Sequence, residues 1–271
     1  MIRDITLGQY FPSDSLIHSL DPRTKIIITF FYIIETFVVN NFIGFLALSL
    51  GLAIVIAASQ VPVKFIFRGL KVIFVIIIFT FILNLFMMDG RVLWHWRFLT
   101  ITYEGLYRAI FVAIRLVLLI IGTSMLTLCT KPIELTDGLE KLLSPLSFIG
   151  VPSGEIALMM SIALRFIPTL MDETDKIIKA QQARGADFES GNVIRRAKSL
   201  IPILVPLFIG SFKIAQDLAL AMEARCYHGG KNRTRMKHIS FKRADAFAFI
   251  IVLIFFLIVS ATRFIEGWHV H

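Results

Sequence analysis

The chain has little charge and very little cysteine for its length. Of its 271 residues only 17% are charged, whereas 56% are hydrophobic and the mean hydropathy is +0.77. Soluble domains are typically about 45–50% apolar and about 25% charged. A 30.7 kDa core cannot hide this apolar surplus, so much of the surface must face something other than water. The composition excludes a soluble, disordered, collagen-like or coiled-coil protein and predicts an all-α integral membrane protein.

Several motifs that carry chemistry are also missing. The two cysteines, Cys129 and Cys226, cannot form a disulfide framework. There is no G-x-x-x-x-G-K-[ST] phosphate loop, the six histidines lack metal-ligand spacing, and no Ser-His-Asp set can be argued. The sequence therefore predicts no cofactor, no metal site and no catalysis of its own. The N-terminus also lacks a secretory signal, so the first apolar run is expected to remain as a membrane span.

Five apolar runs are candidate membrane spans. They are Ile26–Val39, Phe42–Ser59, Val72–Met88, Ala109–Thr130 and Ala246–Thr262. More than a hundred residues of mixed, partly polar texture separate the fourth run from the fifth. We therefore expect a bundle of four spans over residues 1–130, a helical insert over 131–243, and a final transmembrane helix with an outer tail over 244–271.

Basic residues give the expected orientation. The connection 60–71 carries three Lys or Arg and no acid, and the insert 131–243 carries 17 Lys or Arg against 11 Asp or Glu. Basic segments near span ends favour the cytoplasmic side. We expect the N-terminus and the insert in the cytoplasm and the C-terminus outside. The basic stretch 231–243 precedes the last span, so it suits anionic lipid headgroups better than nucleic acid.

A short pattern occurs twice in the insert. The sequence Ala180-Gln-Gln-Ala183-Arg184-Gly185 returns forty-one residues later as Ala221-Met-Glu-Ala224-Arg225-Cys226, each at the expected end of a helix. Small residues let another backbone come close, and arginine presents a planar fork of donors. If the pattern occurred once, the simplest explanation would be that the arginine interacts with the dipole of its own helix, which stabilises the helix by about 0.3–1 kcal/mol. Two copies favour a paired docking surface for a partner with two similar receiving sites.

The chain resembles the transmembrane T component of energy-coupling-factor transporters, which are importers of the ATP-binding-cassette class. Four segments and the two Ala-Arg signatures carry the resemblance, which covers nearly the whole chain. The segments are Gly8–Ser15 with Leu20–Lys25, Leu135–Leu146 and Ala163–Pro168. The signatures are Ala183-Arg184-Gly185 and Ala224-Arg225-Cys226, the second departing from the family's glycine at Cys226.

The resemblance implies a function and partners. In this family the T component joins two cytoplasmic ATPases to a membrane-embedded substrate-binding S component, in the membrane of a prokaryotic cell. It implies that Ala183, Arg184 and Gly185 dock one ATPase, and that Ala224, Arg225 and Cys226 dock the other. The apolar faces of the insert helices would receive the S component, and the insert would be a coupling domain for uptake of vitamins or other micronutrients.

Two charged residues fall inside predicted spans, where ionisable groups are functional candidates. Glu35 lies in the first and Arg115 in the fourth, and they are expected to pair across the bundle or to snorkel. A transport pathway through them is less favoured, because the family assigns substrate binding to another subunit. The alternative functions are a self-sufficient secondary transporter or channel, which predicts repeats among the spans, and a membrane enzyme.

Overall fold

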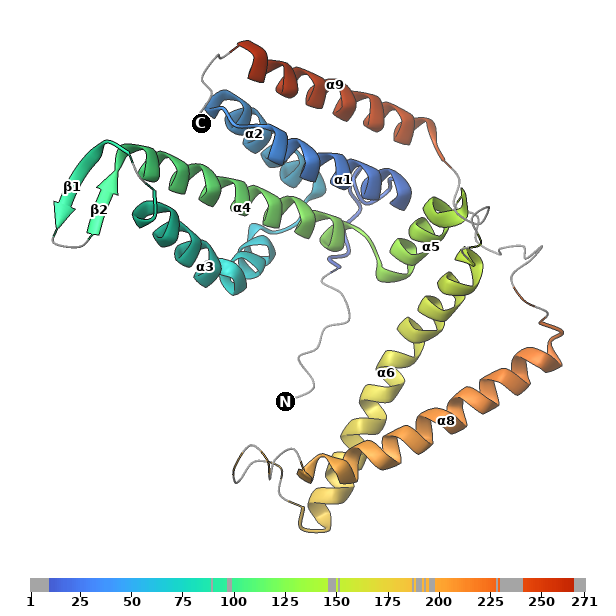
Figure 1. The fold of residues 1–271 in the computed structure, drawn as a ribbon. Coiled ribbons are helices and arrows are strands. Elements are labelled where there is room, and N and C mark those ends of the chain that lie inside the picture. Colours follow the sequence, from blue (N-terminus) through green and yellow to red (C-terminus); the bar gives the residue numbers. More distant parts are fainter. Residues whose placement is uncertain are drawn as a thin grey trace. The chain divides into compact units, whose positions relative to one another are not determined.

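The computed structural model describes residues 10–88, 90–96, 99–145, 150, 152–186, 188, 192, 194, 198–227, 229 and 241–265. The basic stretch 231–240, the first nine residues and the outer tail from 266 onward lie outside this part. The fold is helical apart from one short hairpin (Figure 1). The helices are α1 (Pro22–Val38), α2 (Phe42–Ser59), α3 (Val63–Phe86), α4 (Tyr103–Cys129), α5 (Pro132–Leu143), α6 (Ser153–Ala183), α8 (Ile201–Ala224) and α9 (Arg243–Ile265).

The chain forms two compact units. The bundle unit comprises Gly8–Gly138 and Ile239–His271, and the insert unit comprises Met1–Leu7 and Leu139–His238. The predicted four-span segment and the predicted final helix thus belong to one body, although more than a hundred residues separate them in sequence. The bundle unit holds α1 to α4, α9 and the start of α5, and the insert unit holds α6 and α8.

Within the bundle unit, α1 and α2 each contact both α4 and α9, while α3 packs on α4. The buried centre includes Val39, Leu48, Leu128 and Val259, each at most 1% exposed. Glycine lets the helices approach closely: a Cβ on Gly122 of α4 would collide with the Tyr32 ring of α1. The Tyr32 hydroxyl donates to the Leu118 carbonyl at 3.0 Å, so the aromatic ring has its polar end satisfied.

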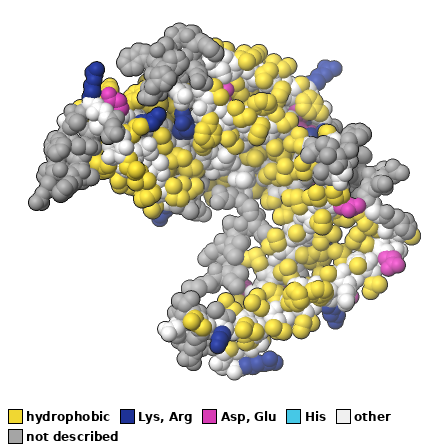
Figure 2. All heavy atoms as spheres, viewed as in Figure 1, with side chains coloured by type: hydrophobic (Ala, Val, Ile, Leu, Met, Phe, Trp, Pro, Cys, Tyr) yellow, Lys and Arg dark blue, Asp and Glu magenta, His cyan; other side chains and the backbone are white. Residues whose placement is uncertain are grey.

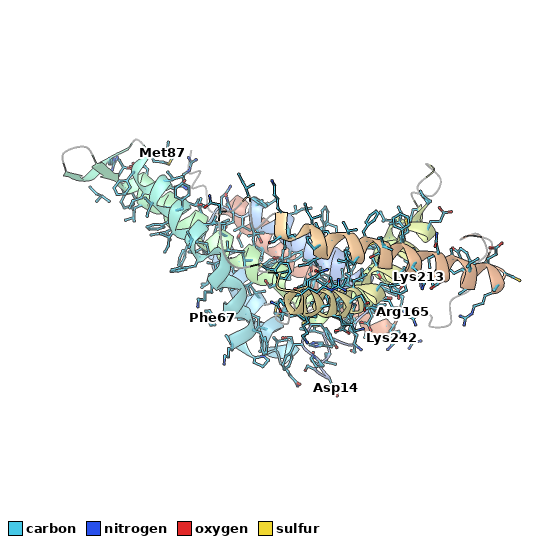
Figure 3. All side chains as sticks on the ribbon, turned by 90° about the horizontal axis from the view of Figure 1, so that it is seen from below. Asp14, Phe67, Met87, Arg165, Lys213 and Lys242 are labelled. Carbon is cyan, nitrogen blue, oxygen red and sulfur yellow. The ribbon has the colours of Figure 1, made fainter. Side chains whose placement is uncertain are left out.

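Most large apolar side chains outside this centre are exposed. Figure 2 shows hydrophobic side chains over most of the visible face of the bundle unit, with few charged ones between them. Phe67 of α3, labelled in Figure 3, is 63% exposed. An apolar surface of this extent is expected only where lipid or another protein covers it. The all-α integral membrane fold is confirmed.

By length and composition, five of the described helices are able to cross a membrane: α2, α4, α6, α8 and α9. The two halves of α3, Val63–Lys71 and Ile73–Phe86, bend by 58° and add a sixth candidate if they are one span. The set differs from the predicted five. Helix α1 has 17 residues and is not among these candidates, whereas α6 and α8 are long and apolar enough to span although they lie in the predicted insert.

A two-stranded antiparallel hairpin joins α3 to α4 and was not predicted. Its strands are β1 (Val92–Trp96) and β2 (Leu99–Thr102), with Val92 opposite Thr102 and Trp96 opposite Leu99. Thr102 ends β2 and also caps α4, because its hydroxyl oxygen accepts from the Gly105 N–H at 3.1 Å. The hairpin therefore fixes the start of the longest helix in the bundle unit.

Candidate functional site: the paired arginine caps

The two Ala-Arg signatures end α6 and α8 in the same backbone conformation. Arg184 is the last residue near helical geometry after α6, and Gly185 follows with φ +84°. The Gly185 N–H donates to the Gln182 carbonyl at 2.9 Å and the Ala186 N–H to the Gln181 carbonyl at 3.0 Å. These two bonds define a Schellman cap.

The second signature repeats this cap bond for bond. After α8, the Cys226 N–H donates to the Glu223 carbonyl at 2.8 Å, and the Tyr227 N–H donates to the Met222 carbonyl at 3.0 Å. Cys226 adopts φ +56°, the left-handed conformation that Gly185 adopts in the first cap. The Gly-to-Cys difference therefore leaves the geometry intact, and its cost is backbone strain.

The caps present both arginines to the outside. Ala183, Arg184, Gly185, Ala224, Arg225 and Cys226 are all exposed. Among the described residues neither Arg184 nor Arg225 makes an ion pair. Each arginine is the C-cap residue of its helix, at the end where the helix dipole favours a cation. A guanidinium carries five donors that a partner can use. The sequence alone placed these residues at helix ends but could not show the shared cap.

The two caps stand at different ends of α8. The Gln181 side-chain amide, in the last turn of α6, donates to the Pro202 carbonyl in the first turn of α8 at 3.3 Å. Figure 1 shows α8 beginning beside the end of α6 and running away from it. Arg184 therefore lies near the start of α8 and Arg225 at its end. The 24 residues of α8 span about 36 Å at 1.5 Å per residue.

Proline explains why the Pro202 carbonyl is available. Residue 206, four positions later, is also proline and has no N–H to donate back to it. The helix nevertheless continues through Pro206 to Ala224. The Pro202 carbonyl, which lacks its helical donor, instead accepts from Gln181 of α6. The missing hydrogen bond within α8 is thus replaced by one between α6 and α8.

The structure gives Glu35 and Arg115 separate partners. Glu35 of α1 accepts from the Ser260 hydroxyl of α9, at 2.8 and 3.0 Å to its two oxygens. Arg115 of α4 donates to the Val39 carbonyl at 3.0 Å and to the Asn40 side-chain oxygen at 2.6 Å. Within the described residues no ion pair joins Glu35 and Arg115. Arg115 instead caps the carbonyl end of α1, where the helix dipole favours a cation.

A second polar cluster in the bundle unit was missed. Asp21, Lys25 and Asp245, from the starts of α1 and α9, are each at most 6% exposed. Lys25 and Asp21 fall in a segment that carries the family resemblance, whereas Asp245 lies outside every motif of the sequence. The available signal was an acid at the start of α9, directly before the uncharged apolar run Ala246–Thr262. Among the described residues no group of His, Cys, Asp or Glu is placed to hold a metal ion.

The bundle, its lipid-type surface and the two outward-facing arginine caps define a multi-pass membrane protein with a separate helical insert. The family described as cobalt transport protein (CbiQ) matches residues 13–236. Three similar proteins are named energy-coupling factor transporter transmembrane protein EcfT. That of Ruminiclostridium cellulolyticum is 59% identical over 94% of this chain and 96% of its own. That of Clostridium kluyveri is 57% identical over 97% and 98%, and that of Bacillus subtilis is 46% identical over 94% and 96%. The chain belongs to this family of transporter membrane subunits.

Proposed function

We propose that this chain is the coupling subunit of an energy-coupling-factor importer, which transmits ATP-driven motion from two cytoplasmic ATPases to a membrane-embedded substrate-binding S component. The imported substrates are vitamins or other micronutrients, and the chain itself hydrolyses no ATP. One observation carries the proposal: two exposed arginines, Arg184 and Arg225, stand on identical helix caps about one helix length apart. Two equal caps suit two copies of a similar receiving groove, one on each ATPase.

The charge pattern of α6 and α8 supports a place for them outside the lipid core. Both helices are apolar enough to span a membrane, but they have the lowest mean hydropathy of the five candidates. Arg165 and Lys213, labelled in Figure 3, project from α6 and α8, and both are exposed. An exposed charge in the lipid core is costly. We place the insert helices on the cytoplasmic side, with the N-terminus, and the C-terminus outside. Their apolar faces would contact the S component.

Replacing the two arginines tests the proposal. A guanidinium that docks in an acidic groove makes charge-assisted hydrogen bonds worth about 1.5–3 kcal/mol. Arg184→Ala or Arg225→Ala should weaken recovery of the ATPases, and the corresponding Glu changes should be worse because they oppose like charges. Lysine should rescue poorly, since it lacks the planar fork. The double Ala variant should lose nearly all ATPase association, because two-point attachment adds about 10²–10⁴-fold in avidity.

The measurement is recovery of both ATPases with a tagged chain, together with substrate uptake in vesicles. Arg165→Ala is the matched control, since Arg165 is also exposed on α6 but is not part of a cap. It should leave recovery and uptake unchanged. Wild-type recovery and uptake in the double variant would refute the docking role of the caps.

A further inference from the structure

Two of the polypeptide connections between the units, the one after Gly138 and the one before Ile239, are fixed at one turn. The chain leaves the bundle unit after Gly138 and returns to it at Ile239. The turn is Asp21–Arg23, which starts α1. A helix whose first residues hold both connections is in a position to receive any movement of the insert helices.

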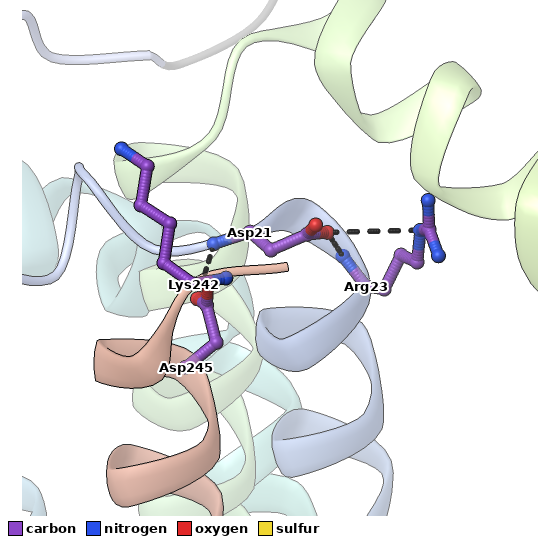
Figure 4. A network of polar contacts seen from close by, with 4 residues as sticks. All are labelled: Asp21, Arg23, Lys242 and Asp245. Carbon is purple, nitrogen blue, oxygen red and sulfur yellow. Dashed lines mark hydrogen bonds and ion pairs between the residues drawn. The ribbon is translucent and has the colours of Figure 1, made fainter. Parts of the chain in front are cut away.

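The returning connection is held by a buried carboxylate. Asp245, in the first turn of α9, is 1% exposed. One of its oxygens accepts from the Asp21 N–H at 2.7 Å, and the other accepts from the Lys242 N–H at 2.8 Å (Figure 4). The second bond is half of a capping box, in which an acid in the first turn reaches back to the residue before the helix. The first bond joins α9 to α1.

Asp21 in turn binds the first turn of α1. Its side chain accepts from the Arg23 N–H at 2.9 Å and lies 3.8 Å from the Arg23 Nε (Figure 4). Pro22 occupies the first helical position, where its ring fixes φ near the helical value. Three hydrogen bonds thus link the Lys242 N–H, through Asp245 and Asp21, to the Arg23 N–H. They hold the start of α9 against the start of α1.

The departing connection is held at the same place. The Lys25 ammonium donates to the Cys129 carbonyl, the last of α4, at 3.0 Å. Further along, an added Cβ on Gly138 of α5 would lie 3.0 Å from the Pro22 Cβ and 3.4 Å from the Arg23 nitrogen. A side chain at this position would require α5 or the start of α1 to move by a few tenths of an ångström, so glycine favours this close approach.

We propose that Asp245 is a positioning residue for transport: its bond to the Asp21 N–H links the returning connection to α1, so that movement of the insert helices shifts the bundle. The inference rests on the proposed coupling function. Without that bond, α9 still packs on α1 and keeps the Glu35–Ser260 bond, but its first turn, where the returning connection enters, is no longer held to the start of α1. Less of the insert movement then reaches the bundle through this connection. ATP hydrolysis would then continue with less transport for each ATP.

The experiment uses the complete complex, with its ATPases and S component, reconstituted into vesicles, and measures substrate uptake and ATP hydrolysis in the same preparation. Asp245→Ala should keep the ATPases and the hydrolysis but lower uptake per ATP by about ten-fold, within the ordinary range of coupling between distant sites. Asp245→Asn keeps one acceptor oxygen and should fall between the wild type and Ala.

Thr102→Ala is the matched control. Thr102 is 2% exposed, and its hydroxyl also serves two partners: it accepts from the Gly105 N–H and donates to the Met88 carbonyl. It caps the opposite end of α4 from Cys129, away from both connections. This variant should lower the melting temperature of the complex, as Asp245→Ala does, without changing uptake per ATP. Equal uptake per ATP in Asp245→Ala and Thr102→Ala would overturn the proposal.

A second variant keeps the test decisive if Asp245→Ala fails to assemble. Gly138→Val pushes α5 away from Pro22 and loosens the other connection, so it should also lower uptake per ATP. Unchanged ratios in Asp245→Asn and Gly138→Val would overturn the proposal. Failure of the coupling function itself would look different, since the wild-type chain would then recover no ATPases.

Discussion

Exchanging the residues at the left-handed position of the two caps should shift their stability in opposite directions. Gly185 and Cys226 both have positive φ, at +84° and +56°. Gly185→Ala introduces the strain that the second cap already carries, and Cys226→Gly removes it. Each change alters one cap and leaves the arginine beside it in place.

The magnitude follows from the backbone alone. A Cβ added at Gly185 meets no atom within 4 Å, so Gly185→Ala introduces no collision. A non-glycine residue in the left-handed region costs about 1–2 kcal/mol. Loss of freedom in the unfolded chain returns about 0.4–1 kcal/mol of this. The net change is about 1 kcal/mol at each cap, which corresponds to roughly a five-fold change in the opening equilibrium.

Hydrogen exchange at the caps measures this directly. The Ala186 and Tyr227 amides make the longer-range bond of each cap, so they exchange when the cap opens. In Gly185→Ala the Ala186 amide should exchange roughly five-fold faster, and in Cys226→Gly the Tyr227 amide should exchange roughly five-fold more slowly. Unchanged rates, or shifts in the same direction, would refute the equivalence of the two caps.

Two further predictions concern pH and orientation. Burial lowers the pKa of His18, whose Nε2 contacts the Phe11 carbonyl at 3.0 Å. The unfolded chain then binds the proton more tightly, so stability should fall as the pH drops below about 6.5, and His18→Asn should reduce this loss in thermal melts from pH 8 to 5.5. For orientation, a cysteine introduced at Lys64 should be shielded from impermeant thiol reagents in intact cells, and one at Trp268 should react. The opposite labelling pattern would contradict the proposed topology.

The sequence located the bundle helices to different degrees. The predicted span Phe42–Ser59 coincides with α2, because it is uncharged and bounded by Asn41 and by Pro62. The predicted span Val72–Met88 covers only the second part of α3. The preceding turns carry basic residues, which favour a connection by composition, but the backbone is already helical from Val63. Hydropathy finds the apolar part of a helix, whereas hydrogen bonding sets its ends.

Long-range partners were beyond the reach of sequence patterns. Asp21 and Asp245 are 224 positions apart, and Glu35 and Ser260 are 225 apart. The sequence led us to expect that Glu35 and Arg115 would pair or snorkel, but it could not show that helix packing brings a hydroxyl of α9 to Glu35. The repeat of the Ala-Arg signature was visible in the sequence. Only the φ angles of the structure show that both copies form the same cap, with Gly185 in the left-handed position of one and Cys226 in that of the other.

Because α8 is continuous, its number of residues fixes the distance and the angle between its two ends. Each inserted residue would move Arg225 about 1.5 Å along the axis and turn it by about 100° around it, so a single insertion would face the arginine almost sideways. Four added residues would nearly restore the direction but lengthen the helix by about 6 Å. In the proposed complex, the spacing of the two ATPase grooves would therefore tolerate changes in composition along α8 far better than changes in its number of residues.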